Sequence, residues 1–439
     1  MKKVIAFLTA ALMLFGLAAC GSEKTKTETD ASDITAGETT LQSQEETTLA
    51  EKEEAEEKSF SFKETVVADK DAYSIKVTKL NPDAKAGYEV KLELVNKDEK
   101  KLNFYLEAVF VNGVQAEVFF GEDVPAGKTA NTSFYVEKEI FEKNGMKEFN
   151  SVEMNFSVND AENWNADPIA VEGAVIYPYG EKYGESYKRE SLPSDIVLID
   201  NDIVKMTVIG WEKDTYGDFR LTFYMENRSD SKEYRYVVES CAVNGVQTGC
   251  INGYDVSAGK VSFGEFSVID ESLKENGITE FTDIRLDIGV IEAESWEADY
   301  VARDSVNIYP EGIDKAVKYE REAKAADVVL ADNDYATVIA EGFDSQGADF
   351  ATLKLYFINK TDKALTFSID SASINDIMLD PFYAQEVGAG NMRFSKVQWE
   401  KSMLTDAEIT AVEVIDFSLR AYESDSYNDV FTQECQLRP

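Results

Sequence analysis

Histidine is absent from the 439-residue sequence. Its absence excludes Ser-His-Asp and Cys-His catalytic groups and every metal site built on imidazole ligands. Basic residues are also few, with 44 Lys and Arg against 83 Asp and Glu, which gives a formal net charge of −39. Because nucleic-acid binding rests on Lys and Arg contacts to phosphate, this charge argues against a nucleic-acid partner. It predicts instead a soluble, mutually repelling surface.

Long apolar runs are absent after residue 19. The one such run, Val4–Ala19, follows the basic start Met1–Lys3. It is too short and wrongly flanked for a spanning helix, and it fits a secretory signal peptide. The run ends in Leu17–Gly21, read as Leu-Ala-Ala-Cys-Gly, which resembles the lipobox of bacterial lipoproteins.

The resemblance implies that residues 1–19 are a lipoprotein signal peptide and that Cys20 is the lipid attachment site, with acyl chains such as palmitate. Two acyl chains form a stable anchor, where one is marginal. The expected location is therefore the cell membrane, lipid-anchored at the extracytoplasmic face. The alternative is an ordinary signal peptide that contains a cysteine by chance.

Residues 20–59 are rich in Thr, Ser, Glu and Lys and almost lack aromatic residues. Such a segment buries too little apolar surface to offset the entropy of ordering, which predicts a disordered acidic tether. As a flexible coil it would span about 35 Å root-mean-square. A role as a binding tail is the alternative to a plain spacer.

The rest of the sequence repeats itself, and the repeat predicts the domain organisation. Val111–Gln115, read as Val-Asn-Gly-Val-Gln, recurs 132 residues later as Val243–Gln247. Ala126–Lys128 recurs as Ala258–Lys260 at the same offset, and a third, more divergent copy keeps Ile374–Ile377. We expect three like domains, at residues 60–190, 191–322 and 323–439.

Within each copy the apolar residues alternate with a period of two, as in half-buried antiparallel strands. In the second copy Leu221, Phe223 and Met225 alternate with polar neighbours. Asn244 and Gly245 between apolar strands form a strong hairpin signal. One short helix is expected over residues 271–276, closed by Gly277 in the left-handed conformation. The spacing predicts an all-β fold of three tandem antiparallel β-sandwich domains.

The order of these motifs resembles the Ig-like domains of Gram-positive surface lipoproteins. It is also similar in architecture to the secreted immunoprotective antigens of mycobacteria. The motifs are the strand ending in Asn, then Val-Asn-Gly-Val, then Ala-Gly-Lys. The resemblance implies Ig-like sandwiches at a cell surface. It brings no common chemistry and therefore no catalytic residues.

Acidic pairs open the three copies and could supply oxygen ligands to calcium. The favoured interpretation is a turn or cap at the entry to a strand, since calcium needs six or more oxygens and no EF-hand spacing is present. The acidic loops further on are also explained by hairpin turns, so we expect no metal and no cofactor. The segments concerned are Asp69–Asp71, Asp200–Asp202, Asp332–Asp334, Asp214–Asp218 and Asp344–Asp349.

The residues also suggest two further kinds of site. Paired carboxylates can hydrolyse glycosides without histidine, but acidic residues are so common here that a pair carries no signal. Trp164, Trp296 and Tyr427 stand at matching loop positions and could stack on a sugar or a protein partner. The favoured interpretation is that such rings cover the end of a sandwich core.

Cys241 and Cys250 flank the Asn-Gly turn, and their distance depends on the loop. A two-residue loop places Cys241 opposite Thr248 and Cys250 on the diagonal, at or beyond the usual limit for a disulfide. A four-residue loop places the two cysteines directly opposite. The first copy has apolar residues at both positions, so a bridge and two buried thiols are both open.

These features predict a non-enzymatic, lipid-anchored surface protein with no catalytic residues. It would act as a spacer or as a binding array for a surface protein or cell-wall glycan. A calcium-stiffened adhesion stalk and a carboxylate-dependent glycan-active enzyme are the alternatives. The linkers Tyr187–Glu190 and Tyr319–Glu322 keep the same register, which predicts ordered elements packed between neighbouring repeats.

Overall fold

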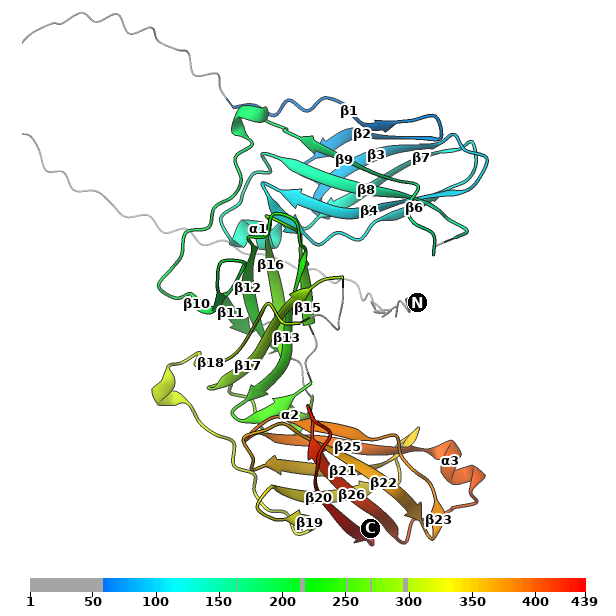
Figure 1. The fold of residues 1–439 in the computed structure, drawn as a ribbon, viewed down its shortest axis with the longest axis vertical. Helices are drawn as coiled ribbons and strands as arrows, with labels where there is room; N and C mark the ends of the chain where they lie inside the picture. The colour runs from blue at the N-terminus through cyan, green and yellow to red at the C-terminus, as the bar shows by residue number, and fades with distance from the viewer. Residues whose placement is uncertain (1–57, 164, 214–217, 250–251, 269–270, 295–298) are drawn as a thin grey trace, which may run out of the picture. The chain divides into compact units, whose positions relative to one another are not determined.

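The computed structural model describes residues 58–163, 165–213, 218–249, 252–268, 271–294 and 299–439 (Figure 1). The signal peptide, the lipid site Cys20 and nearly all of the tether lie outside the described residues, as do Trp164, Trp296 and Cys250. Within the described ranges no helix has the length and apolarity needed to cross a membrane.

The protein is an all-β sandwich fold in which the same order of elements occurs three times (Figure 1). The core-forming residues fall into three clusters, one in each of the ranges 60–190, 191–322 and 323–439, with a few residues contributed by the next repeat. Repeat 1 contains β1 (Thr65–Asp69), β2 (Tyr73–Asn81), β3 (Tyr88–Asn96), β4 (Leu102–Val111), β5 (Val114–Ala116), β6 (Gly121–Val124), β7 (Thr129–Val136), α1 (Glu139–Lys143), β8 (Val152–Asp160), β9 (Ala170–Ile176) and the 3₁₀ turn η1 (Glu181–Tyr183).

Repeats 2 and 3 follow the same plan. Repeat 2 contains β10 (Ile196–Asp200), β11 (Val204–Lys213), β12 (Phe219–Asn227), β13 (Tyr234–Val243), β14 (Val246–Thr248), β15 (Asn252–Val256), β16 (Val261–Val268), α2 (Glu271–Glu275), β17 (Ile284–Glu292), β18 (Ala302–Ile308) and η2 (Ile313–Lys315). Repeat 3 contains β19 (Val328–Asp332), β20 (Ala336–Asp344), β21 (Phe350–Asn359), β22 (Leu365–Ile374), β23 (Ile377–Met378), β24 (Ala384–Val387), β25 (Met392–Glu400), α3 (Lys401–Asp406), β26 (Ile415–Glu423) and β27 (Asp429–Leu437).

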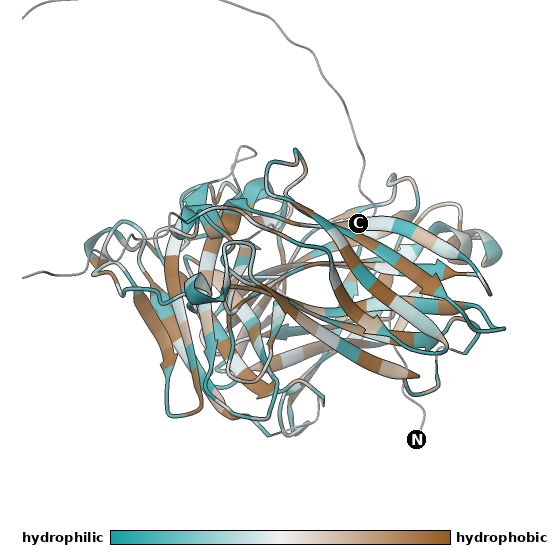
Figure 2. Cartoon of the chain, turned by 90° about the horizontal axis from the view of Figure 1, so that it is seen from above, coloured by the Kyte–Doolittle hydropathy of each residue, from teal (hydrophilic) through white to brown (hydrophobic). Residues whose placement is uncertain are grey.

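Each repeat packs two sheets face to face around its core. In repeat 1 one sheet has the order β1-β2-β3-β7, and the other has β5-β4-β8-β9 with β6 paired to β4. Side chains along each strand alternate between the core and the outside, which Figure 2 shows as alternating hydrophobic and hydrophilic residues. In β12 the alternation holds over all nine residues, as the period of two predicts.

One buried asparagine recurs in every repeat and fixes the loop that follows its strand. The buried Asn96 donates from Nδ2 to the carbonyls of Lys100 and Val124 at 2.7 and 2.8 Å. Asn227 and Asn359 make the equivalent bonds in the other repeats. Because a buried amide without partners is costly, these bonds specify one path for the loop after the strand.

The Asn-Gly turn has the predicted two-residue form. Asn244 and Gly245 have φ values of 52° and 82°, which fits the tight hairpin turn that Asn and Gly favour. Val243 pairs with Val246, and Cys241 pairs with Thr248. The four-residue alternative is therefore wrong. The Asn244 side chain also holds the start of the next strand, accepting from the backbone N–H groups of Thr282 and Asp283 at 3.1 Å.

The short helix and its glycine cap are confirmed. α2 ends at Glu275, and Gly277 follows with a φ of 76°. The next strand, β17, begins at Ile284, directly after Thr282 and Asp283, whose backbone N–H groups bind the Asn244 side chain.

Candidate functional site: the two junctions between repeats

The sheets of neighbouring repeats are continuous, because a short strand of one repeat pairs with a strand of the next. β5 pairs in parallel with β16, with Val114 opposite Val261 and Gln115 opposite Ser262. β14 pairs in parallel with β25, with Val246 opposite Met392. Each junction thereby joins two four-stranded paths and one side strand into a nine-stranded sheet. The recurring Val-Asn-Gly-Val-Gln segment is thus the connector between repeats.

The glutamine that ends this segment fastens the junction. Gln115 donates from Nε2 to the Asp255 carbonyl at 2.8 Å and accepts at Oε1 from the Ser257 N–H at 2.9 Å. Gln247 accepts at Oε1 from the Gly388 N–H at 2.6 Å, in the same place of the second junction. Repeat 3 has Met378 at this position, with its side chain exposed.

Aromatic side chains of the later repeat pack into each junction. Phe263 belongs to the core cluster of repeat 1, with ring centroids of Tyr187 and Tyr224 at 5.9 and 5.7 Å. Phe394 has the same place in the second junction, 5.9 Å from Tyr319 and 4.8 Å from Tyr356. Burying such rings contributes several kcal/mol, so the repeats share part of their cores.

The face of repeat 1 that corresponds to the junction faces of repeats 2 and 3 has polar residues in place of the aromatic ones. Asn131 and Glu93 stand where repeats 2 and 3 have the junction Phe and Tyr. Asn131 is exposed, and Glu93 forms an ion pair with Lys76 at 3.0 Å. This face is therefore suited to water rather than to a preceding sandwich.

The linkers pack against the same surfaces. The Tyr187 N–H donates to the Asn112 carbonyl at 2.7 Å, and the Tyr319 N–H donates to the Asn244 carbonyl at 2.8 Å. Each linker thus binds the asparagine of the Asn-Gly turn in the preceding repeat.

An arginine two residues further on completes each linker. Arg189 binds Asp195 through two bonds of 2.6 and 2.7 Å and lies over the Tyr224 ring. Arg321 binds Asp327 in the same way and lies over the Tyr356 ring. The hydrogen bonds from Arg189 hold the pKa of Asp195 below its usual range, and those from Arg321 lower the pKa of Asp327.

The second linker has one more partner. Glu341 accepts from Arg321 at 2.7 and 2.9 Å, and the side chains of Arg321 and Glu341 are only 6% and 7% exposed. Lys324 adds an ion pair to Glu341 at 3.2 Å. The first junction has the apolar Ile209 at the position of Glu341.

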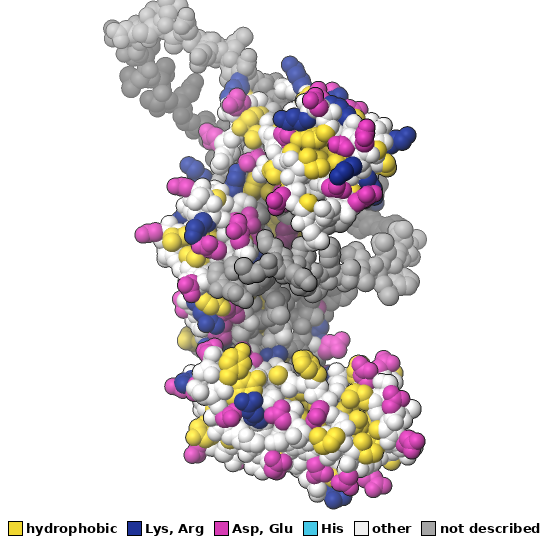
Figure 3. All heavy atoms as spheres, turned by 45° about the vertical axis from the view of Figure 1, so that its right-hand side comes forward, with side chains coloured by type: hydrophobic (Ala, Val, Ile, Leu, Met, Phe, Trp, Pro, Cys, Tyr) yellow, Lys and Arg dark blue, Asp and Glu magenta, His cyan; other side chains and the backbone are white. Residues whose placement is uncertain are grey.

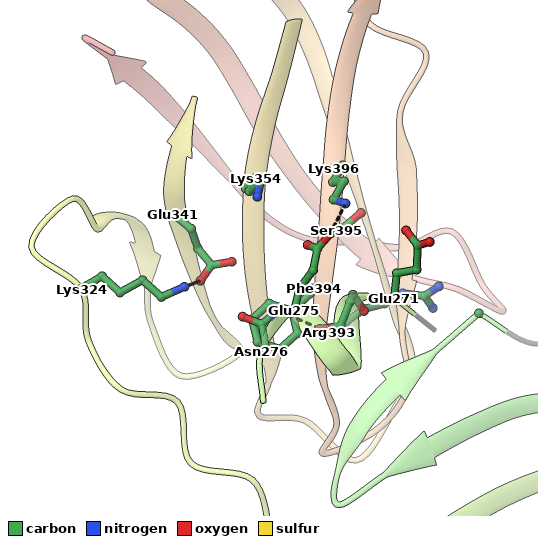
Figure 4. Close-up of a pocket in the computed structure, with 12 residues that line it drawn as sticks. Glu271, Glu275, Asn276, Lys324, Glu341, Lys354, Arg393, Phe394, Ser395 and Lys396 are labelled. Carbon is green, nitrogen blue, oxygen red and sulfur yellow. Dashed lines mark hydrogen bonds and ion pairs between the residues drawn. The ribbon is translucent and has the colours of Figure 1, made fainter. Parts of the chain in front are cut away.

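A cleft opens beside each junction, between the short helix of one repeat and the outer sheet face of the next. The first has a volume of about 220 Å³ and is lined by four carboxylates, Glu117, Glu137, Glu139 and Glu265, with Arg220. The second has a volume of about 700 Å³ (Figure 4). Its charged lining is four cations and three carboxylates: Lys324, Lys354, Arg393, Lys396, Glu271, Glu275 and Glu341.

The two clefts differ in electrostatics. Burial raises the pKa of Glu117, and repulsion from Glu137 and Glu265 adds to the shift. In the second cleft Lys396 lies 3.4 Å from Glu275. The second cleft has the larger share of cations although the protein as a whole is strongly acidic. On the face drawn in Figure 3, acidic side chains are scattered over the surface rather than gathered in one patch.

The acidic pairs at the start of each repeat bind cationic side chains. Lys97 donates to Asp69 Oδ1 at 2.6 Å and to the Lys70 carbonyl at 2.7 Å. Lys360 makes the same two contacts to Asp332 and Asn333, and Arg228 makes them to Asp200 and Asn201. An ammonium or guanidinium group thus binds the first carboxylate of each segment, one of the oxygen ligands that the calcium hypothesis considered.

The middle residue of these segments forms the expected turn in two repeats. Asn201 accepts at Oδ1 from the N–H groups of Ile203 and Val204 at 2.8 Å. Asn333 does the same for Tyr335 and Ala336 at 2.9 Å. Asp344 accepts from the Gln346 N–H at 2.7 Å in its hairpin. Turn chemistry therefore explains these polar residues, as predicted.

The remaining predicted positions that the structure describes are Tyr427, Cys241 and Cys435, and they belong to separate environments. Tyr427 is 72% exposed and stacks on Tyr422. Cys241 is fully buried opposite Thr248, and its disulfide with Cys250 stays a prediction because Cys250 lies outside the described residues. Cys435 is buried in the core of repeat 3, and burial raises the pKa of its thiol to about 11.

Comparison with known proteins places the chain in no family, since no family model and no curated protein matches it. Solved structures similar to part of it include red sea bream transglutaminase, at 10% identity and a TM-score of 0.15 over 53% of this chain and 31% of that one. Another is Escherichia coli alpha-2-macroglobulin activated by porcine elastase, at 12% identity and a TM-score of 0.14 over 83% of this chain and 32% of that one. The chain spans about a third of each protein's length, and scores this low carry no argument about function.

Proposed function

We propose that the protein is a non-enzymatic surface spacer, anchored through a lipid on Cys20 at the extracytoplasmic face of the cell membrane. One observation supports the spacer role above the others: two junctions of the same construction connect the three repeats. Each combines a shared sheet, a glutamine clamp, a buried phenylalanine and an arginine-fastened linker. Connections of this kind keep consecutive domains at a fixed spacing, which is the property that a spacer requires.

The chemistry of the clefts also fits a protein without catalytic activity. The charged residues that line them are Lys, Arg and Glu. Glu271, Glu275 and Glu341 share their cleft with four cations, and Glu341 is held by Arg321 and Lys324. A carboxylate held in this way is a poor general acid or base.

The junctions can be tested by single-molecule energy transfer between dyes on the exposed Lys85 and Asp425, attached through non-natural amino acids. The expected result is one narrow distance distribution. The double change Gln115→Ala and Phe263→Asn should broaden it, because both the clamp and the shared core are lost. Asn131→Ala, at the matching position of repeat 1, should leave it narrow. A broad distribution in the unmodified protein would contradict the spacer role.

The anchor has its own test. Cys20→Ser should release the protein from the membrane fraction or leave it unprocessed, because the sulfur that accepts the lipid is gone. Cys435→Ser, which removes a thiol of repeat 3, should leave the protein in the membrane fraction. A Cys20→Ser protein that stays membrane-bound at its normal mature size would overturn the lipid attachment.

A further inference from the structure

The second cleft contains two lysines that face each other across neighbouring strands. Lys354 on β21 pairs directly with Lys396 on β25, and both side chains are exposed on the outer sheet face (Figure 4). Directly opposed residues lie about 4.5–5.5 Å apart at their Cβ atoms, and like charges at that spacing destabilise a sheet. A pair of this kind needs a compensating group.

The other two repeats show that the pair is not required by the fold. The matching cross-strand partners are Thr222 and Glu265 in repeat 2, and Lys91 and Ser133 in repeat 1. Neither combination places two like charges together. The lysine pair is thus a feature of repeat 3 alone among the three repeats. It lies at the second cleft, whose volume, unlike that of the first, falls in the usual range for small-molecule sites.

Protein carboxylates compensate only part of this charge. Glu275 lies 3.4 Å from Lys396, and Glu341 is already bound by Arg321 and Lys324. Among the described residues, Lys354 has no ion-pair partner. The space above the two lysines therefore offers positive charge to a ligand.

We propose that this cleft binds an anionic sugar, with its phosphate or carboxylate held between Lys354 and Lys396. The carboxylates of Glu271 and Glu275 line the same cleft and can accept hydrogen bonds from sugar hydroxyls. The same carboxylates would repel a densely charged polyanion, which favours one anionic group flanked by neutral hydroxyl-bearing rings. The proposal goes beyond the spacer role and does not depend on the lipid anchor.

The experiment is isothermal titration calorimetry of the purified protein at low ionic strength with four probes: maltose 1-phosphate, a glucuronic acid disaccharide, maltose and inorganic phosphate. One or both of the anionic sugars should bind. Maltose should not, and phosphate alone should bind at least about ten-fold more weakly than the sugar, since it lacks the hydroxyl contacts. The first two probes distinguish a phosphorylated from a carboxylated ligand.

The double change Lys354→Thr and Lys396→Glu, which installs the residues of repeat 2, should weaken binding at least about ten-fold. Lys91→Thr, at the Lys354 position of repeat 1, should leave binding unchanged. The thermal midpoint provides a check independent of binding: Lys354→Thr should keep or raise it, because a like-charge contact is relieved. Absent binding of both anionic sugars, equal binding of phosphate alone, or unchanged binding by the double variant would overturn the proposal.

Discussion

The junction between repeats 1 and 2 and the junction between repeats 2 and 3 share their backbone contacts and differ in the charges beside them. Both use a parallel strand pair, a glutamine and a phenylalanine from corresponding positions. The charged residues of the cleft next to the first junction are four carboxylates and one cation, and those of the cleft next to the second are four cations and three carboxylates. The residues that hold the repeats together thus recur, while those that face solvent vary in sign.

The difference extends to the linker arginines. Arg189 binds one carboxylate, whereas Arg321 binds two, Asp327 and Glu341. A buried guanidinium has five N–H donors, and a second carboxylate satisfies more of them. The second junction therefore depends more on electrostatics, and the first has apolar Ile209 at the place of Glu341.

The largest effect is expected from removing the arginines. Arg321→Ala leaves the buried carboxylates of Asp327 and Glu341 without their guanidinium, which should cost about 3–5 kcal/mol in the free energy of opening the linker. Arg189→Ala leaves only Asp195 without its guanidinium partner and should therefore lower the free energy of opening the first linker by less. Native-state hydrogen exchange of residues 319–330 and 187–198 measures both values. An equal loss of opening free energy at the two linkers would show that Glu341 adds no stability to the second. Arg438→Ala, which changes an exposed arginine, serves as the control.

The glutamines should show a smaller effect that is similar at both junctions. Gln115→Ala and Gln247→Ala each leave backbone groups of the next repeat without a partner, at a cost of about 1–3 kcal/mol. The amides of β16 and β25 should then exchange faster. Met378→Ala, at the same position of repeat 3, where the side chain is exposed, should change neither rate. Faster exchange at only one junction would show that the two glutamines do not contribute equally.

Acid should weaken both linkers. The pKa of Asp195 and the pKa of Asp327 are lowered in the folded protein, chiefly by hydrogen bonds from Arg189 and Arg321. A lowered carboxyl pKa contributes stability that is present above the unfolded value of about 3.9 and is lost as pH falls through the folded value. Linker exchange should therefore rise below about pH 4. Asp195→Asn should flatten this pH dependence at the first linker and leave it at the second.

Much of the fold follows from the sequence, because the informative signals are local. The period of two placed residues such as Leu221 and Phe223 on the core face, and the Asn244–Gly245 turn has the predicted register. Gly277 closes α2 with a positive φ, since a residue without Cβ adopts that conformation without strain.

The junctions could not be predicted in the same way. The local sequence predicts a hairpin within one repeat at Val-Asn-Gly-Val-Gln. Nothing in that segment shows that its second strand also pairs with the next repeat. Thr207 lies between Met206 and Val208 in β11, where simple alternation assigns it to the solvent face, yet it is 2% exposed and lines a cavity together with Arg189 of the linker. One signal was available: aligned repeats place Asn131 against Phe263 and Phe394, which marks a position with a different environment in repeat 1.

The pairing of the two cross-strand lysines could not be predicted from the sequence for another reason. Lys354 and Lys396 are 42 residues apart, and their pairing follows from the register between β21 and β25. Alternation predicts that each side chain points outward, but not that they share a cleft with α2 of the preceding repeat. The candidate site therefore depends on contacts between repeats that a single strand pattern does not contain.

The smallest effect should come from the acidic cleft, and its sign distinguishes the two junctions. The pKa of Glu117 is raised by burial and by the nearby Glu137 and Glu265, so its charged form opposes folding above that pKa. Glu117→Gln should raise the thermal midpoint slightly at pH 7, with the gain limited because Glu117, although surrounded by neighbouring atoms, keeps an exposed surface at which water screens part of its charge. The gain should vanish as pH falls through the raised pKa, where the native side chain is itself neutral. Glu271→Gln, which removes a carboxylate from the cation-lined cleft, should not raise the midpoint. If both changes stabilise the protein equally, the benefit reflects its overall negative charge rather than a difference between the two clefts.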